Sequence, residues 1–281
     1  MALRSFLATS RLRDRVILIA QMDCPDRSHR QAPMTLFVTG ETDFRICPQC
    51  GLAFRAELPP AADLEKIYLR AYASQAIGTH ATEQESGSYS IARYADYLEQ
   101  NLLQQDSRAL DVGAGTGELV ATLRQRGLSA DGMEISAAAR AYCVAQRGIA
   151  LHADMDAVPR GIYDLVSMIE VIEHLSDLWA TLRSVHAALR PAGKLFITTP
   201  NRKGWRARLE GGNWREARKK FHLLLFDETS LRHHLRATGF DSVVRVRFSP
   251  VVKAGFGMWA TARTTQLAGL GGTLCVIASR P

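Results

Sequence analysis

The stretch Leu110-Asp-Val-Gly-Ala-Gly-Thr-Gly-Glu118 decides the fold of this chain of 281 residues. It follows a short apolar run at 108–112, typical of a buried strand, and it opens a segment whose apolar residues have helical spacing. The glycines Gly113, Gly115 and Gly117 let the backbone turn tightly and let a ligand lie against it. Their G-x-G-x-G spacing differs from the G-x-G-x-x-G of dinucleotide-binding folds. We therefore expect a strand, a ligand-binding loop and a helix, in that order.

Outward from this loop, strand-like and helix-like patterns alternate to the end of the chain. We expect strands at 108–112, 129–135, 149–153, 163–169, 194–198, 242–248 and 273–279, and helices at 117–125, 137–146, 177–189 and 227–238. This alternation predicts an α/β fold with a mostly parallel sheet covered by helices on both faces. Upstream we distinguish a basic extension at 1–21, a cysteine-containing segment at 22–60 with a strand at 35–38, and a helical linker at 61–105 broken by a polar loop at 78–90; the α/β domain spans 106–281.

Acidic residues stand at the tips of the first three predicted strands, where ligands of open α/β sheets bind. Asp111 can accept a hydrogen bond from a positively charged amino group, which an anionic pyrophosphate would not offer. Glu134 can accept two hydrogen bonds from ribose hydroxyls. Asp154 can accept from an adenine amino group while Met155 packs against the ring. Ser136 is a typical N-cap for the helix that follows Glu134.

These stretches resemble the class I S-adenosylmethionine-dependent methyltransferases, and within them the ubiquinone-type enzymes and their bacterial relatives in glycan and natural-product pathways. The resemblance is carried by LDVGAGTGEL, GMEIS, YDLVSMIEVIEHLSD, LRPAGKLFITTPN and FHLLLFDETSLRHHLRATGF, in the expected order over 106–281. It implies a Rossmann-like, seven-stranded sheet of order 3-2-1-4-5-7-6 with the last strand antiparallel. It also implies that S-adenosylmethionine is bound by Asp111, Gly113, Gly115, Gly117, Glu134, Ile135, Asp154, Met155 and Glu170.

The fourth predicted strand runs into Glu170-Val-Ile-Glu173-His174, which should border the transferred methyl group. Methyl transfer is a displacement at an activated carbon, so positioning supplies most of the catalysis. A hydroxyl or amine acceptor must still lose a proton. We expect His174, with Glu173 beside it and His222 further along the chain, to serve this step. Two alternatives stay open: His174 is a structural histidine bonded to the backbone, or Glu170, Glu173 and His174 gather a divalent metal.

The net charge of +7 is concentrated in two places. Residues 202–220 hold eight cations and two glutamates, interleaved with Trp205 and Trp214, and residues 1–21 carry a further excess of three. In the resembled family the region after Asn201 folds over the substrate, so the basic stretch suits an anionic acceptor. The alternative is a solvated, partly disordered flap. The remainder of the chain is close to neutral, which disfavours nucleic acid as a partner.

The segment Cys47-Pro-Gln-Cys50-Gly51 has the spacing of a zinc knuckle. Relatives in bacterial glycan clusters often open with two such pairs, but here Arg27 stands where a second cysteine of the first pair would be. His29 could replace it, so that Cys24, His29, Cys47 and Cys50 hold a structural zinc ion. The alternative is a vestigial ribbon that folds without metal. Cys143 and Cys275 are expected in the core.

Five cysteines at irregular spacing predict a reducing compartment rather than a disulfide framework. We expect a cytoplasmic protein with no membrane span, or a mitochondrial one if 1–21 is a transit peptide. The favoured function is methyl transfer to an O or N atom of a small-molecule, lipid-quinone or glycan acceptor. The other hypotheses are a nicotinamide-dependent oxidoreductase and a non-catalytic scaffold of the same fold. The sequence does not identify the acceptor or the oligomeric state.

Overall fold

The computed structural model describes residues 23–29, 35–39, 42–57, 91–248 and 264–281. The basic extension at 1–21 and the polar loop at 78–90 lie outside these residues. So does most of the expected helical linker, of which α2 (Ile91–Asn101) forms the described end. None of the described helices is long and apolar enough to cross a membrane.

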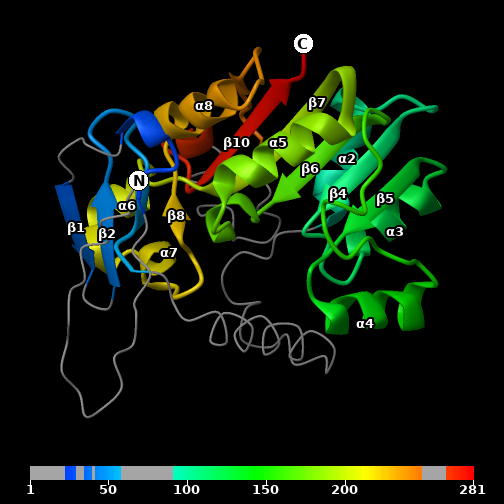
Figure 1. Ribbon diagram of the computed structural model, residues 1–281, viewed down its shortest axis with the longest axis horizontal. Helices are drawn as coiled ribbons and strands as arrows, with labels where there is room; N and C mark the ends of the chain where they lie inside the picture. Colours follow the sequence, from blue (N-terminus) through cyan, green and yellow to red (C-terminus); the bar gives the residue numbers. More distant parts are fainter. Residues whose placement is uncertain (1–22, 30–34, 40–41, 58–90, 249–263) are drawn as a thin grey trace, which may run out of the picture.

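A six-stranded sheet forms the centre of the molecule (Figure 1). Its order is β5-β4-β6-β7-β10-β9, with the strands β4 (Arg108–Val112), β5 (Ser129–Met133), β6 (Tyr163–Ile169), β7 (Leu189–Pro200), β9 (Val244–Arg245) and β10 (Thr273–Ser279). β4, β5, β6 and β7 pair in parallel, and β10 runs antiparallel to β7. The predicted α/β fold, with its antiparallel last strand, is confirmed.

The prediction of a strand at 149–153, which would have made seven strands in the sheet, is wrong: the sheet of the described residues has six strands. Only one parallel bridge, between Met133 and His152, remains at the edge beside β5. The chain turns away directly afterwards, because Asp154 Oδ1 accepts a hydrogen bond from Ala157 N at 2.9 Å. β9 is likewise shorter than the expected 242–248, and β7 starts earlier than the expected 194.

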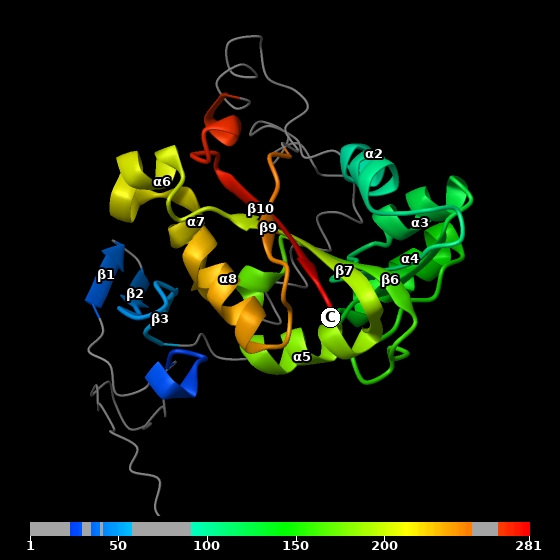
Figure 2. The same cartoon turned by 90° about the horizontal axis from the view of Figure 1, so that it is seen from above.

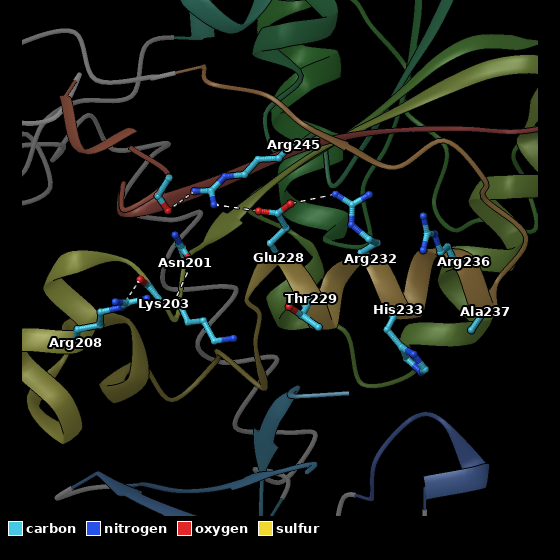
Figure 3. Close-up of a pocket in the computed structure, with 11 residues that line it drawn as sticks. Asn201, Lys203, Arg208, Glu228, Thr229, Arg232, His233, Arg236, Ala237 and Arg245 are labelled. Atoms are coloured by element: carbon cyan, nitrogen blue, oxygen red, sulfur yellow. Dashed lines mark hydrogen bonds and ion pairs between the residues drawn. The ribbon is translucent and has the colours of Figure 1, made fainter. Parts of the chain in front are cut away.

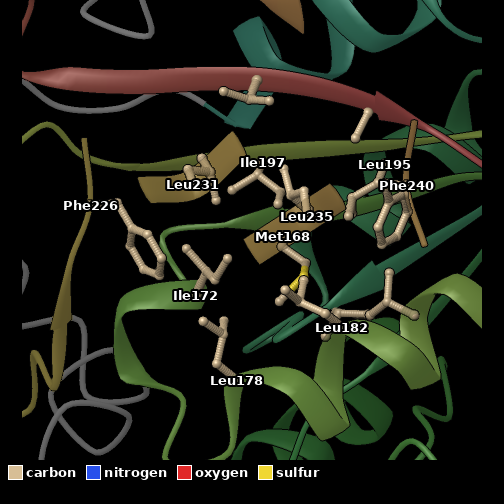
Figure 4. Packing of buried hydrophobic residues seen from close by; sticks show 14 of the residues in the cluster. Met168, Ile172, Leu178, Leu182, Leu195, Ile197, Phe226, Leu231, Leu235 and Phe240 are labelled. Carbon is tan, nitrogen blue, oxygen red and sulfur yellow. The ribbon is translucent and has the colours of Figure 1, made fainter. Parts of the chain in front are cut away.

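Helices cover both faces of the sheet, as the alternation of strands and helices predicts. α5 (Leu178–Ala188) and α8 (Glu228–Ala237) pack against Met168, Leu195 and Ile197 (Figure 4). On the other face, α2, α3 (Glu118–Gln125) and α4 (Ala137–Arg147) pack against Leu165, Phe196 and their neighbours. Neighbouring strand residues thus enter different cores, as the two-residue period of a strand requires.

The cysteine-containing segment forms a small ribbon, which we define as residues 23–29, 35–39 and 42–57. It contains the one-turn helix η1 (Arg27–His29) and the strands β1 (Thr35–Thr39), β2 (Thr42–Ile46) and β3 (Ala53–Arg55). β8 (Leu224–Leu225), from the α/β domain, pairs antiparallel with β3 and completes this second sheet. The ribbon and α4 lie at opposite ends of the molecule in both views (Figures 1 and 2).

The basic stretch 202–220 folds into short helices rather than a partly disordered flap. It forms α6 (Trp205–Glu210), η3 (Gly211–Asn213) and α7 (Arg215–Arg218). Trp214 is buried in a small core with Phe44 of β2 and Leu225 of β8. The stretch is therefore packed against the ribbon sheet.

Asp227 fastens this region to α8. It is buried, caps α8 through Ser230 N, and forms ion pairs with Arg202 at 2.5 Å and Lys203 at 3.0 Å. Arg202 also donates to Gly51 O of the ribbon at 2.7 Å. One carboxylate thus joins the ribbon, the basic stretch and the first turn of α8.

Replacing Asp227 should therefore destabilise the fold strongly. Asp227→Ala removes the cap and leaves Arg202 unpaired, and we expect the free energy of unfolding to fall by about 3–5 kcal/mol. Asp227→Asn, which can still cap α8, should cost less. Urea titration followed by circular dichroism measures both, with the exposed Asp106→Ala as control. A loss for Asp227→Ala no larger than that of the control would refute the anchoring role.

Candidate functional site

The glycine loop follows β4 and is held to the neighbouring strand. Gly113 N and Ala114 N both donate to Met133 O of β5, at 2.8 and 2.9 Å. All three loop glycines have positive φ, and a Cβ on Gly113 would meet Val171 Cγ2 at 2.5 Å. A side chain at that position is therefore excluded by both conformation and space.

Asp111 lies buried directly before this loop. Its Oδ1 accepts a hydrogen bond from Ser167 Oγ of β6 at 2.7 Å. Burial raises the pKa of the Asp111 carboxyl to about 7, although the Ser167 hydrogen bond opposes the shift. A nearby cationic amino group would favour the ionised form, which is the contact that the sequence predicts for this residue.

Glu134 reaches from the end of β5 to the glycine loop. Its Oε2 accepts from Gly115 N at 2.9 Å and its Oε1 from Ser136 N at 2.7 Å. A carboxylate oxygen has two lone pairs, so it can accept from a backbone N–H and from a hydroxyl group. Beside it the side chain of Ile135 is 63% exposed, an apolar surface next to the loop. Ser136 caps α4 as predicted, through Ala139 N.

The positions of Asp154 and Met155 indicate ligand binding less clearly than those of Asp111 and Glu134. Asp154 is exposed, and its Oδ1 serves the turn to Ala157 described above. Met155 is half-buried and packs against the main core. Their expected contacts with adenine stay a prediction.

Glu170 stands at the end of β6 in a conformation that only glycine adopts easily, with φ 55°. Its Oε1 is buried and has no hydrogen-bond partner among the described residues. Burial, and then the nearby Glu173, raise the pKa of Glu170 well above its usual range. Strain and an unpartnered polar atom at a strand end are typical of ligand sites.

Glu173, His174 and His222 come together, although 48 positions of sequence separate the last two. Their potential ligand atoms all lie within 4.8 Å of one another, and His174 Nε2 lies 3.9 Å from Glu173 Oε1. Glu173 Oε1 and His222 Nδ1 are buried without hydrogen-bond partners among the described residues. The arrangement could exchange a proton or hold a metal ion, and Glu170 is not part of it.

Burial sets the charge state of this group. It raises the pKa of Glu173 to about 7, against a hydrogen bond from Thr199 Oγ1 at 2.9 Å. Burial also lowers the pKa of His174 and lowers that of His222 well below its usual range. Both imidazoles are therefore neutral at neutral pH.

The tautomer of His174 follows from its partner. Its Nδ1 lies 2.9 Å from Phe221 O, and a carbonyl oxygen can only accept a hydrogen bond. In the neutral ring Nδ1 therefore carries the proton, and Nε2 lies 3.9 Å from Glu173 Oε1. The backbone bond of the structural alternative therefore exists at Nδ1.

Arg55 of the ribbon holds the segment that carries His222, a role that the sequence does not indicate. Its buried guanidinium donates through Nε to His222 O at 2.8 Å and through Nη2 to Lys219 O at 2.7 Å. The backbone of Arg55 also donates to Leu223 O, while Leu223 N donates to Glu173 O. An arginine just after a zinc knuckle is no signal by itself, because its partners lie more than 160 positions away.

The four predicted metal ligands of the ribbon are brought together and buried. His29 Nδ1 lies 3.6 Å from Cys24 Sγ and 3.5 Å from Cys47 Sγ, and Cys24 Sγ lies 3.7 Å from Cys50 Sγ. Tetrahedral zinc with ordinary bond lengths places two sulfurs about 3.8 Å apart and a sulfur and a nitrogen about 3.5 Å apart. All five cysteines are free thiols. The donor set and its spacing therefore fit zinc.

Residues outside this group orient its ligands. Trp179 Nε1, which can only donate, lies 2.9 Å from His234 Nδ1. The proton of His234 is therefore on Nε2, which lies 3.6 Å from Cys50 Sγ and donates to it. Asp26 Oδ2 faces His29 Nε2 at 3.6 Å. Such carboxylate–histidine pairs commonly orient metal ligands.

The chain is similar in sequence to known methyltransferases. The chain is 30% identical over 105 residues to a ubiquinone biosynthesis O-methyltransferase of Pseudomonas aeruginosa and 33% identical over 106 residues to one of Parvibaculum lavamentivorans. These matches cover 34% and 35% of this chain, and 45% and 42% of the relatives, so the chain spans less than half the length of either.

Solved structures show the same fold. A SAM-dependent methyltransferase from Thermotoga maritima superposes with a TM-score of 0.54 at 16% identity, over 76% of this chain and 99% of the other. One from Archaeoglobus fulgidus gives 0.52 at 15% identity, over 72% and 99%. The methyltransferase domain family matches residues 86–245, which contain the glycine loop, Glu134 and the Glu173–His174–His222 group. The chain therefore belongs to the methyltransferase domain family.

Proposed function

We propose that this protein transfers a methyl group from S-adenosylmethionine to an O or N atom of a small-molecule, lipid-quinone or glycan acceptor. The observation that carries the proposal is that Glu173, His174 and His222 meet just beyond β6, where Val171 lies against Gly113 of the loop flanked by Asp111 and Glu134. The donor's sulfonium supplies the activated methyl carbon. Asp111 would receive the amino group of the donor and Glu134 its ribose.

In this proposal His174 Nε2 takes the proton that the acceptor loses. Its neutral state at physiological pH suits this role, and the bond to Phe221 O fixes the ring orientation. Glu173 Oε1, 3.9 Å away, can stabilise the imidazolium that forms. His222 forms the neighbouring wall, with its ring centroid 4.9 Å from that of His174. The anionic character expected of the acceptor stays a prediction.

The test of the activity uses labelled donor. Protein incubated with S-adenosylmethionine carrying a labelled methyl group and a cell extract should transfer label to a metabolite, identified by mass spectrometry. His174→Ala should lose the transfer while still binding the donor. Calorimetry with S-adenosylmethionine and with NAD separates the remaining hypotheses: a scaffold gives no transfer, and an oxidoreductase prefers NAD.

Glu134 gives the sharpest test of donor binding. Glu134→Ala removes acceptors for the ribose and also the tie to Gly115, so S-adenosylmethionine should bind more weakly by about 1.5–3 kcal/mol. Asp156→Ala, which changes an exposed acid in the loop after His152, is the control. Unchanged affinity by calorimetry would contradict the ribose assignment.

We also propose that Cys24, His29, Cys47 and Cys50 bind one structural zinc ion. The purified protein should carry up to one equivalent of zinc, because three thiolates and an imidazole form a closed tetrahedral site. Cys47→Ser should lose the metal, and Cys143→Ser, a buried cysteine outside the group, should keep it. Elemental analysis that finds no zinc in protein prepared without chelator would refute the proposal.

Arg55 should act as a positioning residue for the proposed transfer. Arg55→Ala releases the Lys219–His222 segment, so kcat should fall by roughly tenfold or more while donor affinity is unchanged. The acid limb of the pH–rate profile should move as well, because the surroundings of both histidines change. Arg55→Lys should recover part of the rate, and Arg45→Ala on the adjacent strand is the control. If Arg55→Ala merely lowers the melting temperature, with kcat and pH profile intact, the residue is structural.

A further inference from the structure

A cleft of about 700 Å³ opens along the outer face of α8 (Figure 3). Its other walls come from β9, from the chain around Gly269 and from the start of the basic stretch at 203–208. None of the residues assigned above to the donor, the proton transfer or zinc lines it. Its volume is in the range of small-molecule sites.

The walls of this cleft are strongly basic. Lys203, Arg208, Arg232, Arg236 and Arg245 line it, and Glu228 is the one carboxylate among the lining residues. Three separate elements contribute these cations, so the charge does not come from one solvated helix face.

Glu228 holds two of the guanidinium groups in place. Its Oε1 accepts from Arg232 Nη2 at 3.0 Å, and its Oε2 accepts from Arg245 Nη1 at 3.2 Å. Arg245 is further fixed through Nη2 to Gly269 O at 2.8 Å. Figure 3 shows the two arginines on either side of the shared carboxylate. Two ordered cations therefore share a single negative charge.

Other cations of the cleft keep donors free. Arg236 is exposed, and its side chain has no partner among the residues that the structure describes. Arg208 uses Nε to bond Lys203 O at 3.0 Å, and its two terminal nitrogens have no described partner. These donors, unlike those of Arg232, are available to a ligand.

The cleft is remote from the donor loop. Arg245 lies on β9, at one edge of the sheet, whereas Glu134 follows β5 at the opposite edge. Five strand spacings separate these edges, roughly 24 Å. An anion in the cleft would therefore not occupy the donor site.

We propose that this cleft binds a phosphate ester carrying at least two negative charges. Arginine forks match phosphate oxygens in pairs, and a divalent anion offsets a large part of the excess positive charge that Glu228 leaves. This site goes beyond the proposed methyl transfer and does not depend on it. The ester belongs either to a soluble molecule or to a lipid headgroup, since both present the same phosphate oxygens.

Titration with inorganic pyrophosphate tests the soluble case. Calorimetry at low salt should give one site per chain, with affinity that falls as salt is added. Arg236→Ser and Arg208→Ser should each weaken binding about tenfold, because each removes charge-assisted bonds. Arg160→Ser, an exposed arginine outside the cleft, should leave the affinity unchanged. Thermal melts confirm that these surface variants fold.

Vesicles containing phosphatidic acid test the lipid case with the same three variants, by co-sedimentation against vesicles of neutral lipid alone. Binding of either probe that is lost in Arg236→Ser and Arg208→Ser, but kept in Arg160→Ser, supports the site. Failure of both probes, or equal binding by all variants, would overturn it. Competition between pyrophosphate and S-adenosylmethionine would also overturn it, because the anion would then occupy the donor site.

Discussion

The pairing of β3 with β8 is the contact on which the proposed acceptor side of the molecule depends. β8 is only Leu224–Leu225, yet it closes the ribbon sheet and begins two residues after His222. On its other side, Leu223 N bonds Glu173 O, so the chain at 222–225 is held between the ribbon and the end of β6. The ribbon is thus part of the wall around the proposed base, and loosening it should disturb catalysis before it disturbs donor binding.

The proposed donor side is built differently, from residues close in sequence. The glycine loop, Glu134 and Ser136 lie within 24 positions, and their hydrogen bonds join one βαβ unit. Such local interactions produce a recognisable sequence motif, because each glycine and each strand-end acid is required by the conformation of its immediate neighbours. The proposed acceptor side joins residue 55 to residues 170–174 and 219–223. Contacts between residues so far apart in the sequence produce no periodic pattern of residue types, so the sequence does not predict them.

This contrast explains what the sequence could predict. β6 and β10 were expected at the residues where they occur, because buried strands read as apolar runs with clear turns around them. In the ribbon, Cys47 and Cys50 were predicted from their spacing, and Cys24 and His29 from the resemblance to relatives that open with two such pairs; the structure brings all four together. The strand at 149–153 failed because one bridge at His152 is all that forms before Asp154 turns the chain. Arg55 and the packing of the basic stretch on the ribbon were missed, since both depend on β8 being a shared strand.

A metal ion in the ribbon would have a consequence beyond local stability. The ribbon's described strands have three to five residues, which is too little for an independent core, and small folds of this kind commonly need a metal or a larger partner. Here the α/β domain is such a partner: β8 completes the sheet, and His234, bonded to Trp179 of α5, donates to Cys50. α8 carries His234 and is capped by Asp227, which fastens the basic stretch. The ligand group, the ribbon and the segment of His222 therefore form one connected unit. Loss of the proposed metal should therefore propagate through Arg55 to the proposed base, while the βαβ unit at the far edge of the sheet, the proposed donor site, should stay intact.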